Sequence, residues 1–272
     1  MKRYIFAAVA AITLLCGCSM KNKPDTLTVT FFDVGKADSF LMTCSGKTLL
    51  MDAGTAKDGK RVAGRLEDMG VERIDYLMIT HFDRDHVGGA AQIIEDFEVK
   101  ELLRPEYMKE SDESALCMAA AERRGVKVSV ITAQSEMQLG NARLVIRPAD
   151  RVYENDPSNN SSLVTEIFHG DNRLLFTGDI EKERIADIKG ELEDGGYDFI
   201  KAPHHGRYEK ILPEFFSLVG AQSAVITSSE KNPEDGQTVQ ALADAGVKDI
   251  LLTRSGEITL QSDGRKLDFT QK

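Results

Sequence analysis

Two histidines and two aspartates lie within six residues of a single segment, Thr80-His81-Phe82-Asp83-Arg84-Asp85-His86-Val87-Gly88-Gly89. Imidazole nitrogens and carboxylate oxygens are the ligands that borderline and hard divalent cations prefer in proteins. The cluster comes at the end of an apolar run, residues 74–80, which is typical of a buried strand. The spacing therefore predicts a metal site at a strand end, with a polar surface turn as the alternative. The candidate ligands are His81, Asp83, Asp85 and His86.

These four side chains converge only if the backbone is irregular. Positions i and i+2 of a helix diverge, and on a regular strand His86 would face away from the other three. A loop between a strand and a helix is therefore expected here. The Gly88-Gly89 pair would permit close approach of backbone beneath a metal.

Two further strand ends carry candidate ligands. Asp179 ends the segment Thr177-Gly178-Asp179, where a carboxylate can project into a cleft, although Gly-Asp is also a common turn. The other strand end is Pro203-His204-His205-Gly206. Adjacent histidines point in different directions, so we expect one to ligate a metal and the other to orient or bind substrate. We favour His204 as the ligand.

The elements that must position these residues alternate between strands and helices in both halves of the chain. Strands are expected at residues 27–32, 39–43, 47–51, 74–80, 99–103, 126–131, 142–146, 162–168, 173–177, 197–201, 223–228, 250–253, 258–261 and 266–269. Helices are expected at residues 60–69, 87–97, 114–124, 181–188, 211–219 and 238–245. This order suggests an α/β (α+β) fold of two sheets packed face to face, with helices outside.

Several other polar residues have simpler expected roles. His169 lies in a hairpin turn and is expected to be exposed to solvent. Asp33 and Asp38 are expected to shape loops by accepting backbone hydrogen bonds. Cys44 lies in a strand pattern and Cys117 in a helical one, so both are expected to be buried thiols, and a pairing between them stays open.

The first residues have the layout of a secretory signal: Lys2 and Arg3, then an apolar run over residues 4–15, then small residues and cysteine. The ending Leu15-Cys16-Gly17-Cys18 resembles the lipobox of bacterial lipoproteins, which implies lipidation at Cys18 and a membrane anchor. Residues 1–17 are then the signal peptide, 18–25 a tether and 26–272 the folded domain. An ordinary cleaved signal or an uncleaved anchor is the alternative.

The formal charge of the chain is −10. Without Lys2 and Arg3 it is −12, since 32 basic residues then face 44 acidic ones. This balance excludes a protein that coats nucleic acid through a basic surface. Two bound dications would make one site locally positive, so an anionic substrate remains compatible with the composition.

Set beside one another, these motifs resemble the metallo-β-lactamase superfamily, and within it the hydrolase domain of ComEC competence proteins and their stand-alone relatives. The matching segments occur in the family order over nearly all of the chain: residues 31–39, Met51-Asp52-Ala53-Gly54, residues 80–89, 160–164, 176–179 and 201–206. The resemblance implies a four-layer αββα sandwich with the metal site at one edge, between the sheets.

The resemblance also implies two metal positions. One would hold His81, Asp83 and a shared Asp179, and the other would hold Asp85, His86, Asp179 and one histidine of the 204–205 pair. Asp52 would orient a ligand histidine from behind. An oxygen-rich first position suits Mn²⁺ or Mg²⁺ as well as Zn²⁺. We therefore expect two divalent ions, Zn²⁺ or Mn²⁺, with Mg²⁺ as a further candidate.

The chain departs from the superfamily pattern at three places. Most members have histidine where Asp83 stands and another histidine in the region of residues 159–162, and the ComEC-like branch shares both differences. ComEC-like chains also often carry Gly-His-Pro before the penultimate helix, where residues 231–235 here read Lys-Asn-Pro-Glu-Asp. The first two differences argue against a dizinc lactamase, and the third leaves the protonation of the leaving group open.

The function implied is a metal-dependent hydrolase, favoured as a phosphodiesterase or nuclease that acts outside the cytoplasm on an anionic substrate, DNA among the candidates. A hydroxide between two cations about 3.5–4 Å apart would attack phosphorus. Asp85, Asp179 and His205 are the catalytic candidates, and Lys201, His205 or Arg207 could offset phosphate charge. The alternatives are hydrolysis of a lactone, thioester or β-lactam, and a surface binding module without catalysis.

Overall fold

The computed structural model describes residues 26–192 and 196–272. The predicted signal, the lipidation candidate Cys18 and the tether lie outside the described residues. Within these two ranges, no helix is both long and apolar enough to cross a membrane.

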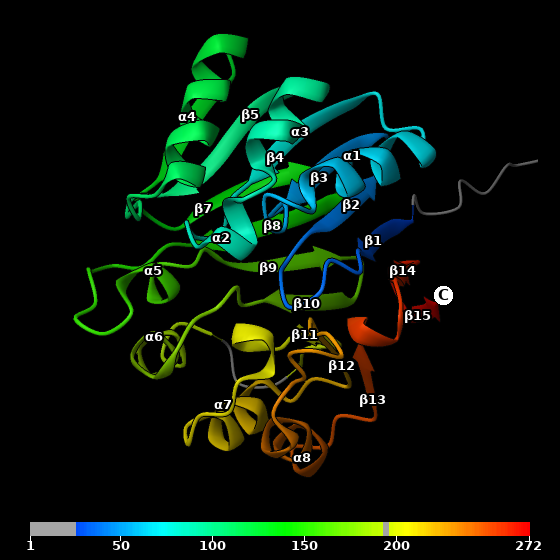
Figure 1. Cartoon of the computed structure of the whole chain (residues 1–272). Helices are drawn as coiled ribbons and strands as arrows, with labels where there is room; N and C mark the ends of the chain where they lie inside the picture. The colour runs from blue at the N-terminus through cyan, green and yellow to red at the C-terminus, as the bar shows by residue number, and fades with distance from the viewer. Residues whose placement is uncertain (1–25, 193–195) are drawn as a thin grey trace, which may run out of the picture.

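Two mixed sheets form the middle of the molecule (Figure 1). The first has the order β15-β14-β1-β2-β3-β4-β5-β6. Its strands are β1 (Leu27–Phe31), β2 (Phe40–Cys44), β3 (Lys47–Met51), β4 (Arg73–Met78), β5 (Glu98–Pro105), β6 (Lys127–Ile131), β14 (Ile258–Ser262) and β15 (Leu267–Gln271). The second has the order β13-β12-β11-β10-β9-β8-β7. Its strands are β7 (Ser135–Leu139), β8 (Ala142–Arg147), β9 (Val164–His169), β10 (Asn172–Phe176), β11 (Phe199–Lys201), β12 (Ser223–Ile226) and β13 (Asp249–Leu252).

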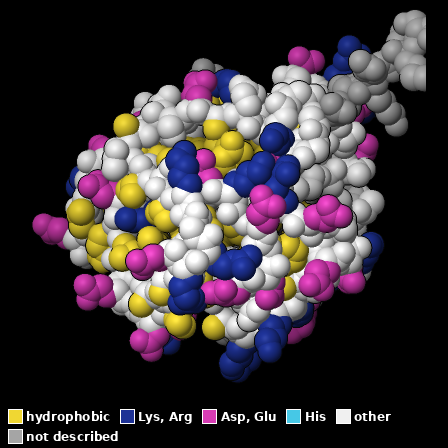
Figure 2. Space-filling view, turned by 90° about the horizontal axis from the view of Figure 1, so that it is seen from above, with side chains coloured by type: hydrophobic (Ala, Val, Ile, Leu, Met, Phe, Trp, Pro, Cys, Tyr) yellow, Lys and Arg dark blue, Asp and Glu magenta, His cyan; other side chains and the backbone are white. Residues whose placement is uncertain are grey.

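Helices cover the outer face of each sheet. Those on the first sheet are α1 (Gly59–Asp68), α2 (Arg84–Val87), α3 (Ala90–Asp96) and α4 (Asp112–Arg124). Those on the second are α6 (Lys182–Ile188), α7 (Leu212–Val219) and α8 (Gly236–Asp244). The one-turn helix α5 (Pro157–Asn160) lies in the connection between β8 and β9, and the 3-10 turns are η1 (Pro203–Gly206) and η2 (Thr253–Ser255). Figure 1 shows the four layers, with α1, α3 and α4 above the sheets and α6 to α8 below, so the expected αββα sandwich is confirmed. On the upper face, acidic and basic side chains are interspersed with hydrophobic ones (Figure 2).

Alternating side chains build three apolar layers. On β2, Phe40 and Met42 face the other sheet, whereas Leu41 packs under the helices, as the period of two in a strand requires. Between the sheets, Phe31 packs against Phe40 with ring centroids 4.8 Å apart, and Phe176 against Phe199 at 5.5 Å.

Strand direction brings the candidate residues to one edge. Strands β3 to β6 pair in parallel, and so do β10 to β13. Their carboxyl ends therefore share an edge in each sheet, and β3, β4, β10 and β11 run directly into the segments that hold Asp52, His81, Asp179 and His205. A strand-end placement was expected from the sequence.

Some expectations about single elements and residues were wrong. Residues 84–87 form the one-turn helix α2 where a loop was expected, and neither β7 nor α5 was expected. His169 is 1% exposed, because its Nδ1 lies 2.7 Å from Ser262 Oγ on the other sheet. Cys44 and Cys117 are both buried, as expected, but they lie in different apolar layers and form no disulfide with each other.

Candidate active site

Asp52, at the end of β3, holds the His81–His86 segment in place. Its Oδ1 accepts a hydrogen bond from the Thr80 amide at 2.8 Å, and its Oδ2 accepts one from the Thr80 hydroxyl at 2.7 Å. The same Oδ2 lies 2.8 Å from His86 Nδ1. This contact directs the opposite ring nitrogen, Nε2, into the site. Asp52 therefore has the orienting position expected from the sequence.

The Gly88-Gly89 pair lets two loops pack without a gap. A Cβ atom on Gly88 would lie 2.4 Å from the Ala56 nitrogen, and one on Gly89 would lie 2.2 Å from the Ala53 oxygen. Side chains larger than hydrogen would push the loop after β3 away from α2. The close backbone approach predicted for these glycines is confirmed, and it fixes the position of His86 against Asp52.

Histidine and aspartate side chains from three strand ends meet at this edge. The ligand atoms of His81, His86 and Asp179 lie within 4.8 Å of one another, as do those of Asp85, His86 and His205. His86 Nε2 lies 3.2 Å, and His205 Nε2 3.0 Å, from Asp179 Oδ2. Neither nitrogen, nor His81 Nε2, makes a hydrogen bond to any described residue, although all three are buried. Buried imidazole nitrogens that converge on a carboxylate in this way fit a divalent cation.

The two adjacent histidines point to different partners. His205 Nε2 lies 3.4 Å from Asp85 Oδ2, whereas His204 is directed outward, with its Nδ1 2.9 Å from Glu181 Oε1. The backbone explains the split, because His204, His205 and Gly206 have φ values of 45°, 53° and 76° in succession. This left-handed turn brings His205 into the cluster in place of His204, the histidine favoured from the sequence.

Asp83 lies beside the cluster and belongs to none of the His/Asp groups found among the described residues. Its Oδ1 accepts a hydrogen bond from Lys109 Nζ at 2.9 Å. Burial opposes ionisation of this carboxyl, but Ser158, His81 and Lys109 lower its pKa. Asp83 is thus an ionised carboxylate at the rim, next to His81, with one oxygen already held by a lysine.

A buried lysine carries much of the charge balance. Lys201 Nζ is wholly buried, 2.6 Å from Asp38 Oδ2 and 3.3 Å from Asp179 Oδ1. It is not exposed for direct contact with a substrate phosphate, and its charge, which was expected to offset that of a phosphate, is paired with these two carboxylates. Asp38 was expected to shape a loop, yet it is fully buried and accepts a 2.6 Å hydrogen bond from Thr227, which lies 2.9 Å from His205 Nδ1. Lys201 is the last residue of the apolar strand β11, and this position was the one sign in the sequence that its charge is buried.

Residues 32–226 match the Metallo-beta-lactamase superfamily. This chain belongs to that superfamily. It is 25% identical to ComE operon protein 3 of Bacillus subtilis over 224 residues, which are 75% of this chain and 28% of that protein. It is 27% identical to Recombination protein 2 of Haemophilus influenzae over 220 residues, 78% of this chain and 25% of that protein. The chain thus spans little more than a quarter of the length of these curated relatives.

A solved structure shows the same fold. The metallo-beta-lactamase fold protein YhfI from Bacillus subtilis superposes with a TM-score of 0.56 at 12% identity, over 88% of this chain and 100% of that one. The superfamily assignment and the His/Asp groups together support a metal-dependent hydrolase.

The 159–162 segment, which contains no histidine, holds the backbone at Asp179 and Glu181. Ser162 Oγ accepts a hydrogen bond from the Asp179 amide at 3.1 Å. Asn160 Oδ1 accepts one from the Glu181 amide at 2.9 Å. A Cβ on Gly178, whose φ is +55°, would lie 2.7 Å from Ser162 Cβ. The segment therefore fixes where Asp179 and Glu181 point; Glu181 was not singled out in the sequence.

Two histidines of the site, His81 and His205, have pKa values shifted in opposite directions. Burial, and next the neighbouring His86, lowers the pKa of His81 to about 3, so its ring is neutral at pH 7. Burial also disfavours a charged His205, but Asp179 and Asp38 outweigh it and raise the pKa to about 10. The pKa of Asp179 is held well below its usual value against burial, mainly by His205 and His86. Dications could replace the histidine protons that now balance these carboxylates.

Proposed function

We propose that this protein is a ComEC-like phosphodiesterase or nuclease that uses two divalent cations, Zn²⁺ or Mn²⁺, outside the cytoplasm. The observation that carries the proposal is the pair of His/Asp groups that share His86 and converge around Asp179. The names of its relatives, a ComE operon protein and a recombination protein, favour DNA as the substrate.

The ligand set that we propose follows the distances. His81, His86 and Asp179 surround one position, with Asp83 at its rim. Asp85, His86 and His205 surround the other, and Asp179 lies next to His205. Two cations held there would supply a hydroxide and polarise a phosphoryl oxygen. His204, which is paired with Glu181, would then orient or bind the substrate.

Exposed cations beside the site suit an anionic substrate. Arg84 and Arg207 are 80% and 57% exposed, and Lys109 is 49% exposed. A cavity of about 580 Å³ opens beside Asp83 and Asp85 and is lined by Arg84 and Lys109. Its other charged groups are acidic, so phosphate entry there depends on the cations that neutralise the carboxylates.

We further propose that residues 1–17 are a signal peptide, that Cys18 is lipidated, and that residues 18–25 tether the domain 26–272 to the membrane.

A substrate panel tests the proposal. The full chain in detergent, loaded with Mn²⁺ or Zn²⁺, is assayed on single-stranded DNA, a chromogenic phosphodiester, a lactone and a β-lactam, with metal content measured in parallel. Hydrolysis of DNA or phosphodiester that is lost in Asp179→Ala supports it. Asp244→Ala, which removes an exposed carboxylate on α8, is the matched control and should keep full activity. Turnover of carbonyl substrates alone, or no metal and no turnover, contradicts the proposal.

A further inference from the structure

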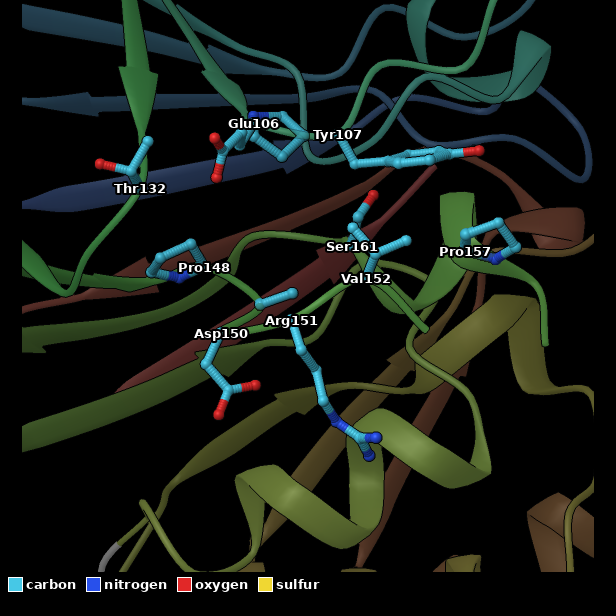
Figure 3. A pocket seen from close by; sticks show the side chains of 11 residues that line it. Glu106, Tyr107, Thr132, Pro148, Asp150, Arg151, Val152, Pro157 and Ser161 are labelled. Atoms are coloured by element: carbon cyan, nitrogen blue, oxygen red, sulfur yellow. The ribbon is translucent and has the colours of Figure 1, made fainter. Parts of the chain in front are cut away.

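A second cavity, of about 270 Å³, lies between loops of the two sheets (Figure 3). It is formed by the chain after β5, after β6 and after β8, together with α5. Its volume falls just under the range of about 300–1,000 Å³ for pockets that bind drug-sized ligands. The cavity therefore has room for one flat chemical group and not for a length of polymer.

Two walls of this cavity are close in the chain to residues that contact the proposed metal site. Tyr107 precedes Lys109 by two residues, and Lys109 Nζ lies 2.9 Å from Asp83 Oδ1. Ser161 directly precedes Ser162, whose Oγ accepts the Asp179 amide at 3.1 Å. Successive Cα atoms are about 3.8 Å apart, so each wall is one or two residues from a group that contacts a candidate ligand. The cavity is therefore near enough to the proposed metal site for one substrate to reach both.

The lining selects against phosphate and in favour of a neutral ring. Of the described lining residues, Arg151 is the basic one, and its guanidinium points away from the cavity and pairs with Asp187 at 2.9 and 3.0 Å (Figure 3). Glu106 supplies a carboxylate to the lining, which repels a phosphate and accepts hydrogen bonds from amino groups, whereas the Asp150 carboxylate points away from Tyr107 and Ser161 (Figure 3). Tyr107 and Ser161 also line the cavity, and in Figure 3 the hydroxyl of Ser161 points toward the side on which the Tyr107 ring lies.

We infer that this cavity binds the nucleobase next to the scissile phosphodiester, which stacks on Tyr107 while the phosphate lies at the metal site. The inference rests on the proposed function and adds to it a base-binding subsite. Every base has a flat π-face, so stacking on an aromatic ring tolerates any sequence. The Glu106 carboxylate and the hydroxyls of the lining add hydrogen-bond acceptors for exocyclic amino groups of the base.

The test compares two minimal substrates that each contain one phosphodiester. One is a dinucleoside monophosphate with both bases, and the other is the same molecule with both bases replaced by hydrogen. The full chain, loaded with Mn²⁺, should prefer the first in kcat/KM. Tyr107→Ala should lower that preference about 5- to 150-fold, which corresponds to the ~1–3 kcal/mol that a stacked base contributes. Tyr107→Phe keeps the ring and should retain the preference.

Leu116→Ala, which truncates a 56% exposed side chain on α4 outside the cavity, is the control and should change neither rate. An unchanged preference in Tyr107→Ala, or an equal loss on both substrates, overturns the inference. Binding of free adenosine and thymidine, which carry no phosphate, is measured by NMR on the same proteins. If the unaltered chain hydrolyses no phosphodiester, the proposed function fails, yet nucleoside binding lost in Tyr107→Ala and kept in Tyr107→Phe still supports the subsite. Absence of nucleoside binding to the unaltered chain refutes it.

Discussion

Replacing Lys201 by methionine should strongly destabilise the protein. The Lys201 ammonium is wholly buried and lies 2.6 Å from Asp38 and 3.3 Å from Asp179. Methionine fills a similar space but leaves a buried carboxylate without its cation, a change that costs about 3–5 kcal/mol in other proteins. At about 2–4 °C per kcal/mol for a domain of this size, Tm should fall by roughly 6–20 °C. Thermal unfolding of the full chain, followed by circular dichroism at pH 7 with a chelator, measures the shift.

A double-mutant cycle separates lost charge pairing from lost packing. In Asp38→Asn/Lys201→Met neither charge remains, so the double variant should unfold at a higher temperature than the two single losses together predict. Lys127→Met is the control, since Lys127 is 69% exposed in its pair with Glu101 and such surface pairs contribute about 0–1 kcal/mol. A Tm loss in Lys201→Met no greater than in Lys127→Met would refute the reasoning. Strictly additive losses in the cycle would do the same.

Four other changes have distinct expected outcomes. His205→Ala should lose bound metal and activity, whereas His204→Ala should keep its metal, as measured by elemental analysis of the purified variants. Asp52→Asn should weaken metal binding about 10–100-fold in a chelator competition, because the orientation of a ligand histidine is relaxed. Burial opposes ionisation of Asp75, but hydrogen bonds from two lysines and a backbone amide lower its pKa to about 2. The ionised Asp75 carboxylate therefore stabilises the fold above about pH 4, and this contribution is lost as pH falls toward 2. In urea titrations, Asp75→Asn should be less stable than the unaltered chain by ~1–2 kcal/mol at pH 7 but not at pH 2. Under the proposed lipidation, Cys18→Ala should abolish incorporation of a labelled fatty acid into the protein in growing cells.

Strand periodicity and strand-end motifs were enough to predict most of the fold. The apolar runs that precede Asp52, His81 and Asp179 are long, and each stops at a polar motif, so the elements and their order follow. The missed strand β7 has polar residues at three of its five positions, as an edge strand can. Helix α5 is a single turn of Pro-Ser-Asn-Asn, which has no apolar periodicity to detect.

The choice between His204 and His205 needed backbone angles that the residue types alone do not supply. Both histidines have positive φ, a conformation that is uncommon outside glycine, and the turn sends one ring inward and the other toward Glu181. Gly206, with φ of +76°, is the one local residue type that hints at a left-handed turn. Likewise, the partner of Asp38 is Lys201, far along the chain on the other sheet, so the identity of the pair depends on the fold itself.

The charges in the cluster explain how an acidic chain could accept an anionic substrate. Asp38, Asp52, Asp85 and Asp179 contribute four negative charges, Lys201 cancels one, and Asp83 at the rim is balanced by its partner Lys109. With His86 and His205 protonated, the formal charge of the cluster is −1, and it repels a phosphate. If two dications replace those two protons, the formal charge of the cluster becomes +1. The overall charge of −10 does not reveal this change of sign. Under the proposed function, affinity for a phosphodiester should therefore require the metals, and an oligonucleotide should bind the loaded chain and not the chelated one.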